Sequence, residues 1–317
     1  TISVRLSGGG DPDAQADGYV TMLAANNIMG IHTYLKNGMP QLLVMDTKRV
    51  NKYDPSPATP VRPAITNETN IFGGVRTDFF RFCNFLDVGY MTNNRDQIYQ
   101  YSGTGNVTAF NYQINSTNSK ANHMDTCSHI FQMSDRLLFL DTVELGDWTP
   151  QRCRYTPVLQ VDGTASGAGY VDCPTEEKIM GAGFVGKNLA VWFTNSLWEL
   201  RATSNSDIPF KWQRITTTEG CRAPYSVVEY NDGIACIGIR SIHFYDGYKV
   251  KDIDFPNLRD IVDDFDVGNI RFCMGFYSKE NRHLLFTYED DTAAAGVPDR
   301  ILDYNILENN WTVHKSE

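Results

Sequence analysis

The amino-acid sequence predicts an all-β fold, a single β-propeller of about six or seven blades of short antiparallel strands with almost no helix. In residues 189–200, two short strands with apolar residues on both faces flank the polar break 194–196. Such a hairpin is marginal alone and needs similar sheets beside it. Comparable sets of strands recur at roughly the 45–50-residue period of propeller blades. Only residues 260–265 leave room for one helical turn.

Two other architectures agree with the same strand pattern. A β-sandwich and a pair of smaller β domains both use short strands with alternating apolar residues. Both are disfavoured by the even spacing of the sets, which a propeller requires. The first and last strands are also expected to share one blade and so close the propeller.

The strand sets follow one another after an N-terminal arm or loop. Residues 1–18 are rich in glycine and aspartate and form the predicted arm, and residues 19–317 form the predicted propeller. The dipeptide Asn37-Gly38 supplies the positive φ angles of a tight hairpin turn. Third strands tend to end in Tyr-Asp or Tyr-Asn, as at Tyr245 and Tyr304, where a strand with an inward ring runs into a turn. The six predicted sets are 28–54, 79–101, 128–155, 189–215, 227–247 and 270–313.

Composition and charge exclude several classes of protein. With 42% hydrophobic and 12% aromatic residues, the chain can build a large core. A formal net charge of −10 disfavours tight nucleic-acid binding but allows DNA to pass an acidic wall. No apolar run approaches the length of a membrane span, so no membrane insertion is expected. The first residue is Thr1 rather than Met, which fits a processed chain or a piece of a longer one.

The seven cysteines are expected to be buried free thiols. An odd number without a Cys-x-x-Cys pair disfavours both a disulfide framework and a thiolate zinc site. This usage predicts folding in a reducing cytoplasm.

One stretch has the spacing of a metal site. His123, Asp125, Cys127 and His129 are two residues apart, so in a regular strand all four side chains face one way. Nitrogen, oxygen and sulfur donors together suit a transition metal. The simpler interpretation, a polar strand face or loop, is preferred because zinc sites usually draw ligands from two elements. We therefore predict no metal and no other cofactor.

Carboxylate clusters raise the possibility of glycoside hydrolysis. Adjacent carboxylates on a loop point apart, whereas hydrolysis needs two that face each other, so solvated loops are the preferred interpretation. The sequence contains no Gly-x-Ser-x-Gly elbow, no P-loop and no Ser-x-Asp-x-Gly-x-Thr-Trp repeat of sialidases. We predict that the chain is not an enzyme. The clusters are Asp263, Asp264 and Asp266, and separately Glu289, Asp290 and Asp291.

Aromatic residues in or beside the predicted strands are interpreted as packing residues, because large aromatics dominate such interfaces. A sugar-binding face is the alternative use of the tryptophans. Trp148 lies in a predicted loop and is the candidate for an exposed contact residue. Arginines near strand ends (Arg152, Arg154, Arg201, Arg214 and Arg222) either bridge subunits or are solvated. The predicted packing residues are Trp192, Trp198, Phe210, Trp212, Tyr245, Gly247 and Trp311.

Several stretches resemble the β-propeller domain of the tail-hub or nozzle protein of short-tailed bacteriophages. The resemblance covers roughly residues 125–315 and consists of strand sequences rather than a catalytic signature. It is carried by 135–144 with 151–156, by 177–184 with 189–201 and 208–215, and by 220–228 and 245–250 with the closing strands 300–311.

The resemblance implies a virion structural protein, assembled in the host cytoplasm. Copies of the chain, usually six, would form a homo-oligomeric ring that lines the channel for genome ejection. A portal adaptor would bind the ring, tail fibres or other tail proteins would attach outside, and DNA would pass without specific binding. The long loops 55–63, 163–169 and 291–298 would meet these partners. The alternatives are a carbohydrate-binding or glycoside-processing propeller and a cytoplasmic interaction scaffold.

Overall fold

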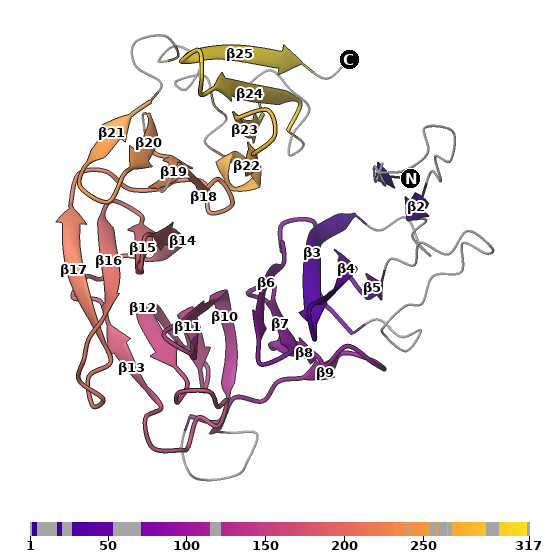
Figure 1. Ribbon diagram of the computed structural model, residues 1–317, viewed down its shortest axis with the longest axis vertical. Helices are drawn as coiled ribbons and strands as arrows, with labels where there is room; N and C mark the ends of the chain where they lie inside the picture. The colour runs from indigo at the N-terminus through magenta and orange to yellow at the C-terminus, as the bar shows by residue number, and fades with distance from the viewer. Residues whose placement is uncertain are drawn as a thin grey trace. The chain divides into compact units, whose positions relative to one another are not determined.

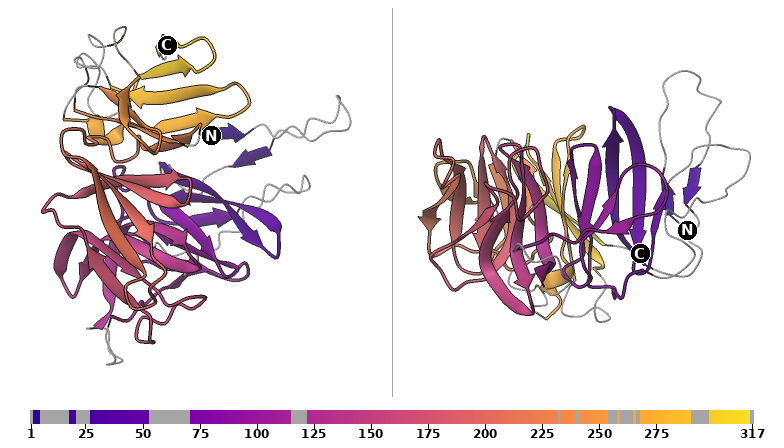
Figure 2. Two further views of the ribbon diagram at one scale, coloured as in Figure 1. Left: turned by 60° about the vertical axis from the view of Figure 1, so that its left-hand side comes forward. Right: turned by 90° about the horizontal axis from the view of Figure 1, so that it is seen from below.

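The computed structural model describes residues 2–4, 18–20, 27–52, 71–114, 122–231, 233–239, 241–253, 258, 265, 268–289 and 298–315. The fold is an all-β, six-bladed propeller, as the sequence predicts. Each blade is a sheet of consecutive antiparallel strands, and Figure 2 shows the last blade, in yellow, as one such meander. The chain divides into two compact units: Thr1–Thr149 with Arg154–Gly169, and Pro150–Cys153 with Tyr170–Glu317.

The first unit begins with a two-stranded sheet and continues with the first blades (Figure 1). The two-stranded sheet pairs β1 (Ile2–Val4) with β2 (Gly18–Val20). Blade 1 consists of β3 (Ile28–Lys36), β4 (Met39–Asp46) and β5 (Val50–Lys52). Blade 2 consists of β6 (Arg81–Phe85), β7 (Val88–Thr92), β8 (Tyr99–Tyr101) and β9 (Thr108–Ala109). Blade 3, of which 150–153 and 170–172 are counted with the second unit, has the strand order β10 (Met124–Met133), β11 (Arg136–Glu144), β12 (Asp147–Tyr155) and β13 (Gly169–Asp172).

The second unit holds the remaining blades, each with four strands. Blade 4 consists of β14 (Ile179–Val185), β15 (Asn188–Phe193), β16 (Leu197–Ala202) and β17 (Phe210–Thr216). Blade 5 consists of β18 (Val228–Tyr230), β19 (Gly233–Ile237), β20 (Ile242–Tyr245) and β21 (Val250–Asp252). Blade 6 consists of β22 (Gly275–Ser278), β23 (His283–Tyr288), β24 (Arg300–Asn305) and β25 (Asn310–Lys315).

Two details differ from the sequence predictions. Within the described residues, β1 pairs with β2, so the first and last strands do not share a blade. The physical reason is that β22 to β25 already supply four strands. Part of the predicted arm is therefore strand, and the rest of 1–18 lies outside the described residues. Of the predicted helical turn 260–265, only Phe265 is described, so this prediction is not tested; among the described residues, one 3₁₀ turn spans Ile270–Phe272.

Local sequence explains the hairpins. Asn37 and Gly38 have φ angles of 49° and 76°, so the predicted tight turn joins β3 to β4. In β15, every residue after Asn188 is buried, in agreement with the prediction of a strand covered on both faces. Such burial requires a sheet on each side, which is what neighbouring blades provide.

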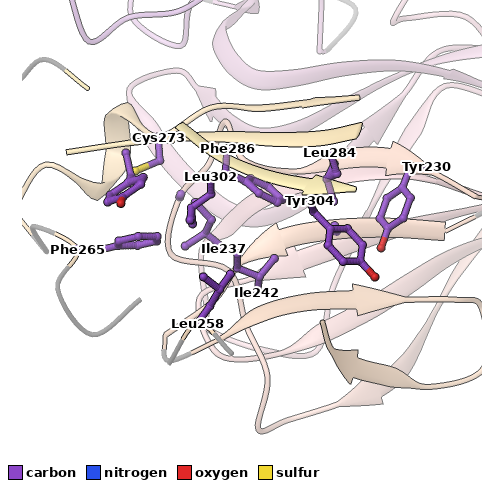
Figure 3. Close-up of a cluster of buried hydrophobic side chains, with 13 residues drawn as sticks. Tyr230, Ile237, Ile242, Leu258, Phe265, Cys273, Leu284, Phe286, Leu302 and Tyr304 are labelled. Carbon is purple, nitrogen blue, oxygen red and sulfur yellow. The ribbon is translucent and has the colours of Figure 1, made fainter. Parts of the chain in front are cut away.

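The core lies between neighbouring blades. In the second unit, one buried cluster joins blade 5 to blade 6 and includes Ile237, Phe286 and Leu302 (Figure 3). Another joins blade 4 to blade 5 around Trp192 and Tyr245. In the first unit, corresponding clusters join blades 1 and 2, and blades 2 and 3. We call each such contact a blade joint.

The first strands of blades 4, 5 and 6 run in the same direction. Tyr225 and Met274, which precede β18 and β22, form a parallel bridge. A Cβ on Gly181 would lie 2.4 Å from Val227, and one on Gly183 would lie 3.0 Å from Glu229. Because a step of two residues along β14 matches a step of two residues towards and along β18, the two strands run in the same direction. Because each blade is an antiparallel meander, the turns after its first and third strands lie at one end. These turns therefore share one end of the second unit.

The seven cysteines are all free, as predicted; six are buried and Cys83 is partly buried. Burial raises the pKa of the Cys83 thiol to about 12. Among the residues that the structure describes, no helix has the length and apolar character needed to cross a membrane.

Candidate functional site

The predicted metal site is not assembled. A β-bulge between Met124 and Thr126 places Asp125 outside the regular ladder, so its carboxylate is exposed and accepts a 2.7 Å hydrogen bond from the backbone N–H of Gly146. The premise that all four side chains share one face is therefore wrong, because a bulge interrupts the strand alternation. Throughout the described ranges, no three His, Cys, Asp or Glu side chains gather as metal ligands.

The other three members of that stretch have separate environments. His123 lies in an isolated bridge with Gln113 before β10. Cys127 is fully buried in the blade 2–3 joint, and its burial raises the pKa of the thiol well above the usual range. His129 is 2% exposed, and its Nδ1 lies 2.6 Å from the Ser128 hydroxyl. Cys127 and His129 thus contribute to packing and local hydrogen bonding.

The predicted packing residues of blade 4 lie inside or against the sheet. Trp192 is completely buried, and Phe210 is 1% exposed at the start of the outer strand. Trp198 is also buried and donates from Nε1 to the Ser196 hydroxyl at 3.0 Å. Trp212 is partly buried, and its Nε1 donates to the backbone carbonyl of Val171 at 3.3 Å.

The remaining predicted packing residues are in blades 5 and 6. Tyr245 is fully buried in the blade 4–5 joint. Gly247 has φ of +90°, and a Cβ there would lie 3.1 Å from Val185. Trp311 stacks on Tyr304 with ring centroids 4.6 Å apart, and its Nε1 donates to the Ile253 carbonyl at 3.1 Å.

A buried carboxylate, Glu199, is the centre of a hydrogen-bond network in the blade 4–5 joint. Glu199 is 1% exposed, and its carboxylate accepts from the Tyr245 hydroxyl at 2.8 Å. It also accepts from Arg201 Nε at 2.6 Å and from Asn188 Nδ2 at 3.1 Å. Burial is the main cause that raises the pKa of Tyr245. Because three donors occupy the carboxylate, Glu199 is suited to hold strands together.

Glu199 is not among the residues that the sequence singled out. The available signal was an acidic residue inside the apolar run Leu197-Trp198-Glu199-Leu200. A carboxylate at such a position is buried and must be paired, because burying an unpaired charge is costly. Its partner Tyr245 is 46 residues away in sequence, so periodicity alone could not connect the two.

Trp148 is 57% exposed, but it lies in β12 rather than in the predicted loop, because Leu145 and Gly146 already complete the turn. Its indole Nε1 donates to the carboxylate of Asp141 at 2.7 Å, and Asp141 is completely buried. This bond fixes the orientation of the ring. Leu145, 49% exposed in the turn between β11 and β12, lies nearby in sequence.

Three of the predicted arginines pair with carboxylates of this chain. Arg152 forms a bidentate pair with Asp172, at 2.8 and 2.9 Å. Arg154 forms a buried pair with Glu144 at 2.5 Å, and Arg201 binds Glu199. These three guanidinium groups stabilise the fold of a single chain. Of the other two arginines, Arg214 is exposed and Arg222 is partly buried.

Several predicted sites fall on residues outside the described part of the chain. The carboxylates Asp263, Asp264, Asp266, Asp290 and Asp291 belong there, as does the loop 55–63 and most of 291–298. Glu289 is described and is 3% exposed. The loop 163–169 is described; the Gly167 carbonyl accepts a 2.6 Å hydrogen bond from Arg136.

Comparison with known proteins supports the fold. No family model matches the chain, and no curated protein matches it. The chain is similar to the extracellular domain of the putative one component system BT4673 from B. thetaiotaomicron, with a TM-score of 0.54 and 10% identity over 92% of this chain and 34% of that one. This chain therefore spans about a third of that structure's length. At this identity, the similarity concerns the propeller fold alone.

Two further solved structures are similar at lower TM-scores. One is PorZ, a surface component of the type-IX secretion system of Porphyromonas gingivalis, with a TM-score of 0.48 and 9% identity over 93% of this chain and 34% of that one. The other is the AfRom2 CNH domain, with a TM-score of 0.45 and 8% identity over 92% of this chain and 85% of that one.

Proposed function

We propose that this propeller is a structural subunit of the tail of a short-tailed bacteriophage. Several copies, six in the simplest case, form the tail-hub or nozzle ring through which DNA leaves the virion. The ring binds a portal adaptor on one side and tail fibres or other tail proteins outside. The propeller fold is compatible with many functions, so the virion role rests on the strand-sequence resemblance and on a contact between two of the resembling stretches.

One observation carries the proposal. Two stretches that carry the resemblance, 189–201 and 245–250, meet in the Glu199 network. Glu199 and Arg201 come from the first stretch, and Tyr245 comes from the second. The resembling residues thus build a joint between two blades. Because residues from the resembling stretches hold two blades together, they support a mechanical role, in which stiff blade joints preserve the shape of a channel wall.

Buried ionisable groups also support a role without catalysis. Glu199 accepts from three donors, and Glu144 accepts a bidentate pair from Arg154 at 2.7 and 2.5 Å. A general acid or base needs a proton that substrate can reach, whereas these carboxylates face protein donors. The net charge of −10 supports passage of DNA past the wall without retention.

Labelling of particles tests the proposal. Fab fragments raised against the purified chain would be bound to phage particles from the source of the gene and imaged by electron microscopy. We expect label at a single vertex, where the tail stands, and none on empty heads that lack tails. Particles without this protein, or label spread over the capsid, would contradict the tail assignment.

Trp148 favours a second candidate function, carbohydrate binding. A tryptophan ring that is 57% exposed and fixed through Asp141 is a stacking surface for a sugar. A glycan array with the natural chain and the Trp148→Ala variant checks this candidate. Binding that disappears in the variant would support it, and an array without signal would remove it.

A further inference from the structure

The turn between β3 and β4 holds the one Asn-Gly dipeptide of the sequence, Asn37-Gly38. Both residues are exposed, and their φ angles are 49° and 76°. A Cβ on Gly38 would meet nothing within 4 Å, so the space around this residue is open. Because glycine carries no side chain, the backbone nitrogen of Gly38 is sterically free to approach the side-chain carbonyl carbon of Asn37.

The fold holds the backbone of this turn but not the side chain of Asn37. The backbone N–H of Asn37 donates to the carboxylate of Asp87, in the turn between β6 and β7, at 3.3 Å. Among the residues that the structure describes, none forms a hydrogen bond with the side-chain amide of Asn37. This amide therefore keeps its rotational freedom beside the Gly38 nitrogen.

Two Asp-Gly pairs of the described chain show the opposite arrangement. At Asp246-Gly247, the carboxylate accepts from two backbone N–H groups of its turn, both at 3.0 Å, and pairs with Lys251 at 2.5 Å. At Asp162-Gly163, the carboxylate accepts from the N–H and the hydroxyl of Thr164, at 2.9 and 2.8 Å. These bonds restrain both side chains, and an ionised carboxylate resists attack by a nucleophile. Asn37 has neither the restraint nor the charge.

We propose that Asn37 is a site of spontaneous modification, at which the chain converts this asparagine into aspartate and isoaspartate. The backbone nitrogen of Gly38 attacks Cγ of Asn37, and the bond from Cγ to the side-chain nitrogen breaks. The proton of the Gly38 N–H passes through solvent to the departing nitrogen, which leaves as ammonia. Water then opens the resulting succinimide ring at either carbonyl, and the two openings give aspartate and isoaspartate. The reaction consumes water and needs no oxidant.

The products weaken the attachment of the β3–β4 hairpin to blade 2. This attachment uses the Tyr34 hydroxyl, which donates to the Asp87 carbonyl, and Lys36 Nζ, which donates to the Ser102 carbonyl at 2.7 Å. A new carboxylate at position 37 lies close to the carboxylate of Asp87, so two like charges repel each other. Isoaspartate also adds a backbone atom to a two-residue turn, whose geometry sets the register of β3 against β4.

Ageing of the purified, folded chain at mildly alkaline pH tests this site. Peptide mapping by mass spectrometry, with electron-transfer fragmentation to separate isoaspartate from aspartate, follows each asparagine over several weeks. We expect Asn37 to be converted several-fold faster than Asn94, and the net charge of the chain to change from −10 to −11. Asn94 is the internal control, because it is exposed and has φ of 57° but is followed by Arg95.

Two variants separate the reaction from its effect on the fold. Asn37→Gln should stay unmodified at this position, and Asn37→Asp should show several-fold faster hydrogen exchange in peptides that cover 28–46 and 81–92. The inference is overturned if Asn37 and Asn94 are converted at equal rates, or if Asn37 is converted only when urea unfolds the chain. Unchanged hydrogen exchange in the aged protein would overturn the effect on blade 2. None of these outcomes depends on the tail assignment, which particle labelling tests.

Discussion

The blade 2–3 joint and the blade 4–5 joint solve the same packing problem with different chemistry. The first is aromatic: Tyr112 and Phe139 have ring centroids 5.1 Å apart, and Tyr90 and Phe110 are 4.8 Å apart. The second buries Trp192 and adds the carboxylate Glu199, which Tyr245 binds from the next blade. An apolar joint tolerates the replacement of one apolar side chain by another of similar size. A buried carboxylate, in contrast, must keep the groups that donate hydrogen bonds to it.

The largest expected effect comes from Trp192→Ala. This change removes the largest fully buried side chain, so the free energy of unfolding should fall by about 3–5 kcal/mol. Urea unfolding monitored by circular dichroism provides the measurement. Trp212→Ala, at a partly buried ring on the outer strand, is the control and should cost clearly less. Equal losses of unfolding free energy in the two variants would show that the blade 4–5 joint contributes no more to stability than the outer strand of the blade.

A pair of hydroxyl deletions sharpens the comparison between the joints. Tyr245→Phe removes a donor from a buried carboxylate and should destabilise the protein by about 1.5–3 kcal/mol. Tyr112→Phe removes a 3.0 Å bond to the neutral backbone carbonyl of Tyr155 and should cost about 0.5–1.5 kcal/mol. Both are measured by the same unfolding experiment. A greater loss in Tyr112→Phe would contradict this distinction between the joints.

Close approach of blades 5 and 6 gives a third expectation. A Cβ on Gly275 would lie 2.4 Å from the backbone carbonyl oxygen of Ser226, so Gly275→Ala must push the strands apart. Overpacking of this kind should cost about 1–3 kcal/mol in unfolding free energy. Gly186→Ala, where a Cβ would meet nothing within 4 Å, isolates the effect of the left-handed backbone. A crystal structure of the Gly275 variant with unmoved strands would argue against the mechanism.

The smallest expected effect is a pH dependence at the blade 1–2 joint. His32 stacks on Phe82 at 3.9 Å, and burial lowers the pKa of its imidazole from 6.5 to about 4. The unfolded chain therefore binds this proton more readily, so His32 lowers stability as the pH falls from about 6.5 to about 4. His32→Gln should flatten this part of a melting-temperature profile. An unchanged profile would assign the dependence to other groups.

The sequence was sufficient to predict the blades because burial on both faces leaves a strong pattern. The strand 189–193 and the tight turn at Asn37-Gly38 follow from apolar alternation and from positive φ angles. The weakest strands could not be predicted in this way: β9 has two residues, and β13 follows a glycine-rich loop. Their pairing depends on a preceding strand rather than on their own residues.

Site residues were predictable only where a local feature identified them. Trp148 was expected to be exposed because it was placed in a loop; it is exposed, but it lies in β12. The bulge at Asp125 could not be predicted, because it arises from the pairing of Thr126 with Val143 and of Met124 with Glu144. The exposed Tyr248 and Leu307 were missed as well, since the pairs Tyr245-Asp246 and Tyr304-Asn305 were recognised without the exposed residue two positions after each Asp or Asn.

Division of the core into separate joints has a mechanical consequence. A tensile load applied to β25 reaches blade 6 first, and this blade adheres to the second unit through its cluster with blade 5. Blade 6 should therefore peel away while the joint around Trp192 still holds. Pulled in an optical trap, the second unit would lengthen in discrete steps, one for each sheet that detaches.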